Sequence, residues 1–334
     1  MRLVALATFL SFAGAPVLAQ SDNRSDTQSD AQEQAEAPQG QAAGQAPRGT
    51  PEGEQPPQAG PPRFLYELSQ TFEVAAVPHV DGGGDAVTTL SRSAFSLVWV
   101  ASRQTQAIFN LSNEFAYYDF DDAFKVDPID GEPFGSFSRQ NLDVVVNHRI
   151  ARQWSIQGLA GVGLTRERSA DLGDSVVWRT GVGSTYHATE NISLGVFILA
   201  NSRLEDDVEI LPLPQIEATF EFDEHWTLIL GSREGATLRY RANDELAFRL
   251  QAGYQERQYR LDDDGFAPDG VFQDKSIDLM LGVQWTPAPG LEVTAGVGSQ
   301  LWRRFKIKDG DGNRLTRSET DPTLTLQAGL SYSF

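Results

Sequence analysis

Histidine and carboxylate side chains are the groups from which this chain would have to build a catalytic site. The chain has four histidines and no cysteine, so a thiolate metal site and a cysteine nucleophile are both excluded. His79 with Asp81 and Asp85 is the one grouping that places a histidine close to acidic partners, as in a hydrolase. No histidine pair has the spacing of a metal motif such as HExxH. We therefore expect no catalytic residue, no bound metal and no cofactor, and keep a hydrolase as a remote alternative.

Residues 309–313, with the sequence DGDGN, resemble the opening of a calcium-binding loop. Side chains that carry oxygen stand at alternate positions, as calcium coordination requires. However, Arg314 stands where an EF-hand needs glycine, and Thr320 stands where it needs its bidentate glutamate. We therefore expect a hairpin turn with at most weak affinity for metal.

The elements that must position these groups are β-strands. In the final segment, residues 323–334 with the sequence TLTLQAGLSYSF, apolar residues alternate with small or polar ones, so a pleated strand would have one apolar and one polar face. The same pattern recurs along the chain and predicts fourteen strands, or twelve if the short segments 226–232 and 236–241 do not both form strands. The predicted strands are 63–77, 87–100, 106–118, 137–150, 154–166, 175–188, 192–201, 210–222, 226–232, 236–241, 246–261, 273–286, 291–305 and 321–334.

The connections between these strands alternate in length along the chain. Short connections such as 151–153 and 189–191 alternate with longer polar segments such as 119–136 and 306–320. Transmembrane β-barrels have this asymmetry, with short turns on one side of the membrane and long loops on the other. A soluble two-layer β-protein, the alternative, has no reason to sort its loops in this way. The sequence therefore predicts an all-β, antiparallel up-and-down transmembrane barrel.

The part of the chain from Phe64 to Phe334 resembles bacterial outer-membrane β-barrels, which include porin-like proteins and barrels of unknown function. The resemblance is carried by the last strand and its terminal Phe334, which in such proteins is a recognition signal for the insertion machinery. It implies an outer-membrane location. It also implies outer-membrane lipid, lipopolysaccharide and the barrel-insertion machinery as partners.

Aromatic residues support this interpretation, because amphipathic rings favour the level of the lipid headgroups. One set stands on the apolar faces where strands meet the short turns, and a second set stands toward the long loops. We expect the first set to mark the membrane interface: Trp99, Trp154, Tyr186, Trp226, Trp285, Tyr332 and Phe334.

The start of the chain has a different composition. Residues 1–19 have a positive end, a short apolar run and small residues before a cleavage point, which predicts a signal peptide cut after Ala19. Residues 20–61 are rich in Gln, Ala, Gly, Pro and Ser and hold almost no large apolar residue, which predicts a disordered periplasmic leader. A tether to the cell wall or a segment that threads the lumen is the alternative. The barrel would then comprise residues 62–334.

The polar faces of the strands would line the lumen, and they carry charges of both signs. Arg304 is placed on this inner face by the alternation. The charges either form a lattice of ion pairs that fills the lumen or line a water-filled path. Our candidate charge patch consists of Arg239, Arg241, Arg249 and Arg257, with Arg179, Glu217 and Glu221.

The net charge of −19 argues against nucleic acid as a partner, because phosphate binding needs clustered Lys and Arg. We expect a passive channel or transporter for small solutes. The first alternative is a closed structural or surface-interaction barrel that contacts partners through its acidic loops, such as 262–264. These loops are either simply solvated or bound to lipopolysaccharide through divalent cations. The remote alternative is a hydrolase at the rim.

Overall fold

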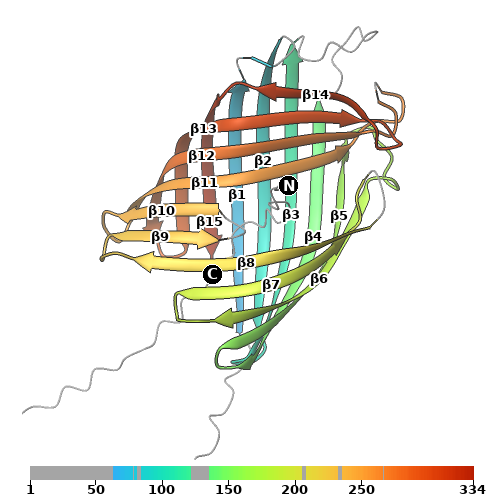
Figure 1. Cartoon of the computed structure of the whole chain (residues 1–334). Helices are drawn as coiled ribbons and strands as arrows, with labels where there is room; N and C mark the ends of the chain where they lie inside the picture. The colour runs from blue at the N-terminus through green and yellow to red at the C-terminus, as the bar shows by residue number, and fades with distance from the viewer. Residues whose placement is uncertain are drawn as a thin grey trace, which may run out of the picture. The chain divides into compact units, whose positions relative to one another are not determined.

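The computed structural model describes residues 63–77, 79–80, 84–121, 135–204, 208–231, 235–265 and 267–334. This part of the chain consists of β-strands joined by turns (Figure 1). Across these ranges no helix is long and apolar enough to cross a membrane. The predicted signal peptide and leader lie outside the described residues, as do Asp81 and the acidic segments 122–134 and 205–207.

The strands follow the alternating segments closely, and most ends agree within two residues. They are β1 Arg63–Val77, β2 Asp85–Val100, β3 Thr105–Asp121, β4 Ser136–Ala151, β5 Trp154–Glu167, β6 Val176–His187, β7 Ile192–Asn201, β8 Glu209–Glu221, β9 Trp226–Gly231, β10 Gly235–Arg241, β11 Leu246–Arg260, β12 Val271–Ala288, β13 Leu291–Lys308, β14 Arg314–Thr320 and β15 Thr323–Ser333.

Fourteen of these strands, β1 to β13 and β15, form a closed antiparallel barrel. Each strand pairs with its neighbour in the chain, and the barrel closes where β1 pairs with β15. The predicted all-β up-and-down barrel is therefore confirmed. The alternative of twelve strands is wrong, because β9 and β10 are both hydrogen-bonded into the wall.

The fifteenth strand, β14, lies in a segment that the sequence predicts as a loop. It pairs with the last residues of β13, from Arg303 to Lys308, so the predicted loop 306–320 is mostly an extended hairpin. The predicted turn at 309–313 joins its two strands. The Asp309 carboxylate accepts hydrogen bonds from the N–H groups of Asp311 and Asn313, at 3.1 and 2.7 Å.

The two ends of the barrel differ. One end carries the short turns, and the other, which we call the long-loop end, carries the longer connections. Strands β1–β5 and β11–β13 are long, whereas β9 and β10 have only six and seven residues. The end of β11 therefore reaches the end of β5, where Arg260 pairs with Arg166 (Figure 1). The barrel is narrowed at its long-loop end.

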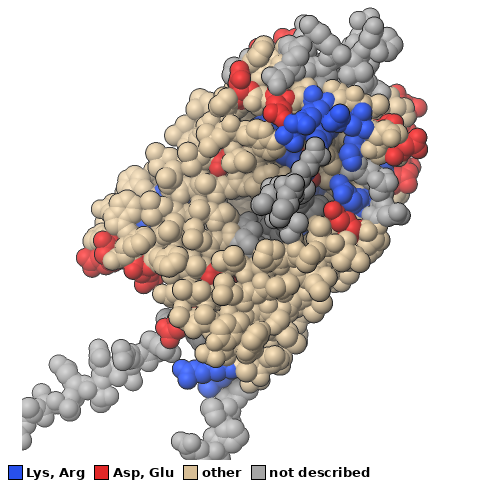
Figure 2. All heavy atoms as spheres, viewed as in Figure 1, with Lys and Arg blue, Asp and Glu red and all other residues tan. Residues whose placement is uncertain are grey.

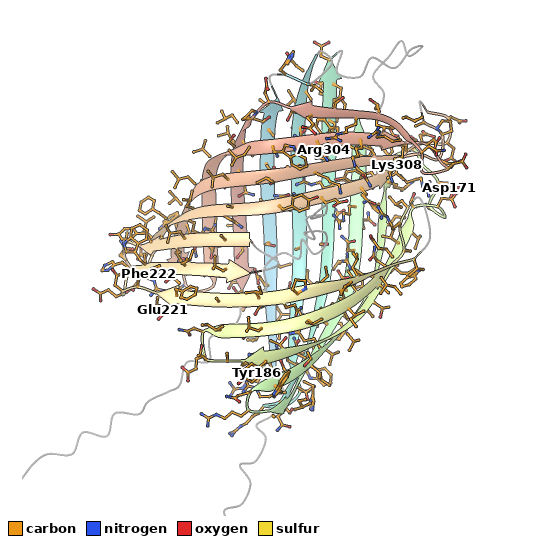
Figure 3. The ribbon with its side chains drawn as sticks, in the orientation of Figure 1. Asp171, Tyr186, Glu221, Phe222, Arg304 and Lys308 are labelled. Carbon is orange, nitrogen blue, oxygen red and sulfur yellow. The ribbon has the colours of Figure 1, made fainter. Side chains whose placement is uncertain are left out.

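The outer surface is a band of exposed apolar side chains, with aromatic residues beside the short turns. Trp99, Trp154, Trp226, Trp285, Tyr332 and Phe334 are all more than a third exposed. Tyr186 packs on Trp154 with a ring separation of 5.1 Å, and it lies at the short-turn end with Glu221 and Phe222 (Figure 3). Such a surface is the one that lipid solvates in an outer-membrane barrel.

Candidate functional site: the lumen and a gap in the wall

The half of the lumen next to the short turns is lined by exposed polar side chains. Glu217, Glu221 and Arg241 face inward from β8 and β10 and are exposed. Arg239 and Arg249 stand directly opposite each other on β10 and β11. The Arg249 Nη1 lies 3.8 Å from a carboxylate oxygen of Glu292. This half of the lumen is therefore accessible to water and carries both signs of charge.

The structure separates two predicted residues from this group. Arg257 lies eight residues beyond Arg249 on the same strand, which corresponds to about 27 Å along the strand. Its guanidinium is buried and lies 3.5 Å from Glu114 and 3.4 Å from Asp274. Arg179 is ion-paired with the buried Asp143. Of the predicted patch, Arg239, Arg241, Arg249, Glu217 and Glu221 thus remain in the short-turn half of the lumen, whereas Arg257 and Arg179 belong to the buried ion pairs.

The long-loop half of the lumen is filled by aromatic side chains from opposite walls. Rings from β3 and β4 touch rings from β11, β12 and β13: Tyr118 lies 5.1 Å from Phe272, and Phe137 lies 4.6 Å from Tyr259. We call this group the aromatic closure, and its six members are Tyr118, Phe120, Phe137, Tyr259, Phe272 and Phe305, all at most 5% exposed. Because opposite walls are in contact, the axial path through the barrel is closed at this level.

A layer of buried ion pairs lies against the aromatic closure. The Tyr118 hydroxyl donates to Asp274, and the Tyr259 hydroxyl donates to Glu114, each at 2.8 Å. Arg303 forms a bidentate pair with the same Asp274. Asp274, Glu114 and Arg303 therefore interact with other side chains of the barrel rather than with a solute.

A β-bulge explains why the sequence missed Arg303. The pairing of β12 with β13 skips Leu301, so the alternation of β13 reverses there. Arg303 consequently points inward and is fully buried, whereas Arg304 points outward. The prediction that Arg304 faces the lumen is wrong for this reason.

The wall has a gap between β8 and β11. β8 pairs with β9 only from Glu217 to Glu221, so its residues 209–216 have no strand partner on that side among the described residues. β11 pairs with β10 only as far as Ala252, so the next residues before Arg260 have no ladder partner there either. Figure 1 shows the short β9–β10 hairpin between the two longer strands. We call this stretch the side gap.

Two prolines occupy the open edge of β8. The N–H of Thr219 donates to the carbonyl of Asn191 in the turn that precedes β7, so alternate residues 217, 215, 213 and 211 direct their backbone groups toward β7. The intervening residues, which include Pro212 and Pro214, therefore present their backbone to the side gap. Proline has no N–H, so two unpaired donors are absent from this edge. These prolines inside a membrane strand are a signal that sequence reasoning overlooked.

Arg260 bounds the side gap at its long-loop end. Its guanidinium donates to three backbone carbonyls from three different loops, those of Asp174, Leu204 and Asp269. A cavity of about 50 Å³ lies between β11 and strands β4 to β7, lined in part by Leu199, Asn201 and Gln258. Such a volume holds a few water molecules.

An apolar patch covers the lumen wall next to the side gap. It extends over strands β3 to β8 and includes no charged side chain. Its members are Ile108, Val145, Leu159, Phe197, Leu199 and Leu213. Val145, Leu159, Phe197 and Leu199 are at most 7% exposed, whereas Ile108 and Leu213 are partly exposed, so an apolar molecule in the lumen would contact the patch at these two residues.

Only His79 and Asp85 of the predicted hydrolase-like grouping lie in the described residues. His79 accepts a backbone hydrogen bond from Asp321 through its carbonyl at 3.3 Å, and Asp81 lies outside the described residues. Over the described ranges, no group of three or more histidine and acidic side chains is arranged to hold a metal.

Comparisons with known proteins were made at three levels. A family model described as a domain of unknown function (DUF6268) matches residues 137–333. No curated protein sequence matches significantly.

Several solved structures are similar to the chain. The TodX monoaromatic hydrocarbon channel deltaS2 mutant is 10% identical with a TM-score of 0.44, over 82% of this chain and 90% of that one. An outer membrane channel from Pseudomonas putida F1 has the same identity and score, over 85% and 100%. A Pseudomonas aeruginosa FadL homologue is 11% identical with a TM-score of 0.40, over 80% and 90%. The similarity concerns the barrel fold alone.

Proposed function

Because the chain belongs to the family described as a domain of unknown function (DUF6268), we propose a function from its geometry: a passive outer-membrane channel for small solutes. The barrel would span the membrane with its short turns in the periplasm and its long-loop end outside. Both ends of the chain would then lie on the periplasmic side. The C-terminal strand would engage the insertion machinery, and lipid and lipopolysaccharide would surround the barrel.

The observation that carries this proposal is the side gap. Unpaired backbone groups are costly in hydrocarbon and are tolerated only where they line a water-filled or protein-covered space. The open edges of β8 and β11 therefore favour a hydrated opening that joins the lumen. Pro212 and Pro214 reduce the number of unpaired donors at that opening.

The path that we propose runs from the periplasmic half of the lumen to the side gap. It begins among the charged side chains of Arg241, Arg249 and Glu217 and passes the apolar patch around Leu213. A molecule with one charged and one apolar part would be favoured at both levels. Benzoate is a simple probe of this kind, and glucose is a polar comparison.

One observation favours the alternative of a closed structural barrel. The aromatic closure and its buried ion pairs fill the outer half of the lumen, so a continuous axial pore is absent from the described structure. A closed barrel would pass neither ions nor solutes. It would act through its surface.

Solute uptake by vesicles that contain the refolded full-length protein distinguishes the two functions. We expect benzoate to enter faster than into empty vesicles and glucose to enter slowly. Leu213→Trp should reduce benzoate entry, because its side chain adds bulk beside the side gap. Val196→Trp on the neighbouring strand is the matched control, because Val196 is exposed on the outer surface.

Each result decides between the proposals. Benzoate entry that falls with Leu213→Trp and not with Val196→Trp supports passage through the side gap. Benzoate entry no faster than in empty vesicles, from protein shown to be folded and inserted, would overturn the channel and favour the closed barrel. Arg249→Glu tests the charged entrance separately, and we expect it to slow benzoate more than a neutral aromatic solute.

A further inference from the structure

The outer surface of the barrel carries a group of basic residues at its long-loop end. The β-bulge at Leu301 turns Arg304, Lys306 and Lys308 outward, because the intervening Phe305 and Ile307 are fully buried. Lys275 and Arg317 lie on the same surface of the neighbouring strands. We call these five residues the outer basic face, and Figure 2 shows Lys and Arg gathered in this region. Figure 3 labels Arg304 and Lys308 on β13.

The strand register brings these like charges together. Lys275 is paired with Arg304, and Lys306 is paired with Arg317, so cations stand directly opposite one another. Like charges in this position destabilise a sheet. Repulsion between these cations would destabilise this part of the sheet if nothing else were bound. We take this as an indication that a negatively charged group from outside the chain binds here.

Nearby carboxylates neutralise only part of this charge. Glu256 lies 2.9 Å from Lys275, and Glu319 lies 2.8 Å from Arg304 and also pairs with Arg317. Lys306 forms no ion pair with a described residue.

The outer basic face begins where the apolar band ends. On β12 the outward side chains from Trp285 to Ile277 are apolar or aromatic, and the next outward residue is Lys275. Eight residues of a tilted strand span roughly 21 Å, close to the ~25 Å height of the lipid-facing band of such barrels. The Arg304 guanidinium lies 4.6 Å from the ring centroid of Trp302. The cations therefore stand at the level of the lipid headgroups.

We propose that the outer basic face binds the phosphate groups of the phosphorylated glycolipid that forms the outer leaflet. Phosphate oxygens accept hydrogen bonds from arginine forks and lysine ammonium groups. The surface faces the lipid side of the barrel, so a phosphate anchored in the leaflet reaches it without leaving the membrane. This site lies on the outer surface and does not depend on solute passage.

A binding titration of the refolded full-length protein with lipid A that carries two phosphates tests this site. Native mass spectrometry would give the dissociation constant for the unchanged protein and for Lys306→Glu with Arg317→Glu. The matched control is Arg103→Glu with Arg152→Glu, which reverses two cations in the short turns at the opposite end. Lys306→Gln with Arg317→Gln replaces the double reversal as the test variant if the double reversal does not fold. Folding of each variant is checked by its heat-modifiable mobility on a gel.

We expect the double reversal to raise the dissociation constant for lipid A about tenfold or more. A change of this size corresponds to the loss of one or more charge-assisted contacts. The control should bind like the unchanged protein, and lipid A without phosphates should bind about as weakly as the double reversal. Equal weakening in the control, or equal binding of lipid A without phosphates, would overturn the proposal. Displacement of lipid A by millimolar inorganic phosphate would also contradict it, because it would identify free phosphate as the ligand.

Discussion

Arg303 and Asp274 form a bidentate ion pair inside the barrel, with Nε–Oδ1 and Nη2–Oδ2 distances of 2.9 and 2.8 Å. Neither side chain has any exposed surface. Asp274 also accepts the hydroxyl of Tyr118 from the opposite wall. The pair therefore links β12 and β13 to the aromatic closure, and its geometry depends on the bulge that turns Arg303 inward.

Removing one partner of this pair should destabilise the barrel strongly. Arg303→Met removes the bidentate partner of the buried Asp274 and leaves only the longer 3.4 Å contact with Arg257, so we expect a loss of about 1.5–3 kcal/mol in the free energy of unfolding. Arg303→Met combined with Asp274→Leu should recover part of that loss, because Arg257 keeps Glu114 at 3.5 Å as its partner and only the Tyr118 hydroxyl loses its acceptor. Urea unfolding in phospholipid vesicles measures both. A single variant within ~0.5 kcal/mol of the unchanged protein would contradict the assigned role.

The aromatic closure should control ion conductance. Phe272 packs against Tyr118, Phe137 and Phe305, at ring separations of 5.1, 5.4 and 5.7 Å. Phe272→Ala should cost about 3–5 kcal/mol and open a water path between the walls. We expect larger single-channel conductance in planar bilayers than for the unchanged protein.

Leu281→Ala is the matched control for this experiment, because Leu281 lies on the same strand and is exposed on the lipid side. It should leave conductance unchanged. If Phe272→Ala conducts no more than Leu281→Ala, something other than the aromatic closure blocks the axial path.

The strands were predictable from the sequence, and the closure of the lumen was not. Alternation decides which side chains face inward, because a membrane strand must keep its outer face apolar. Alternation does not indicate which residues of the opposite wall an inward side chain contacts, so the contact between Tyr118 and Phe272 could not be predicted. Apolar residues at inward positions near the long loops were the available signal.

Local irregularities limited the prediction in two further places. The bulge at Leu301 inverts every later inward assignment on β13, which is why Arg304 was placed in the lumen. The side gap depends on which strands fail to pair, and short runs such as β9 and β10 carry no sign of that. Pro212 and Pro214 marked one edge of it, because proline avoids the centre of a sheet.

Arg260 should hold the side gap at its width. Its guanidinium donates hydrogen bonds to three loop carbonyls through three different nitrogen atoms. A lysine has a single ammonium nitrogen and cannot replace all three hydrogen bonds. We expect Arg260→Lys to lower the unfolding free energy by about 1–3 kcal/mol and to speed benzoate uptake. Arg168→Lys, in the β5–β6 loop, is the control. Slower uptake in Arg260→Lys would show that this residue keeps the gap open rather than restricting it.

The short turn between β8 and β9 should respond to acid through Asp223. This carboxylate accepts the backbone N–H groups of His225 and Trp226, each at 2.8 Å. These two hydrogen bonds lower the pKa of Asp223 below its ordinary value. A lowered pKa in the folded state means that the turn is stabilised above the ordinary pKa, and that this stabilisation is lost as the pH falls through the folded value.

The carboxyl ¹³C shift of Asp223, followed from neutral pH downward, measures this effect. We expect a midpoint below that of an unfolded peptide with the same turn sequence. The N–H signals of His225 and Trp226 should move at the same midpoint, since both donate to this carboxylate. In Asp223→Asn the side-chain oxygen still accepts hydrogen bonds but does not titrate, so the two N–H signals should lose the step. A midpoint at or above the peptide value would show that the two hydrogen bonds do not favour the charged form.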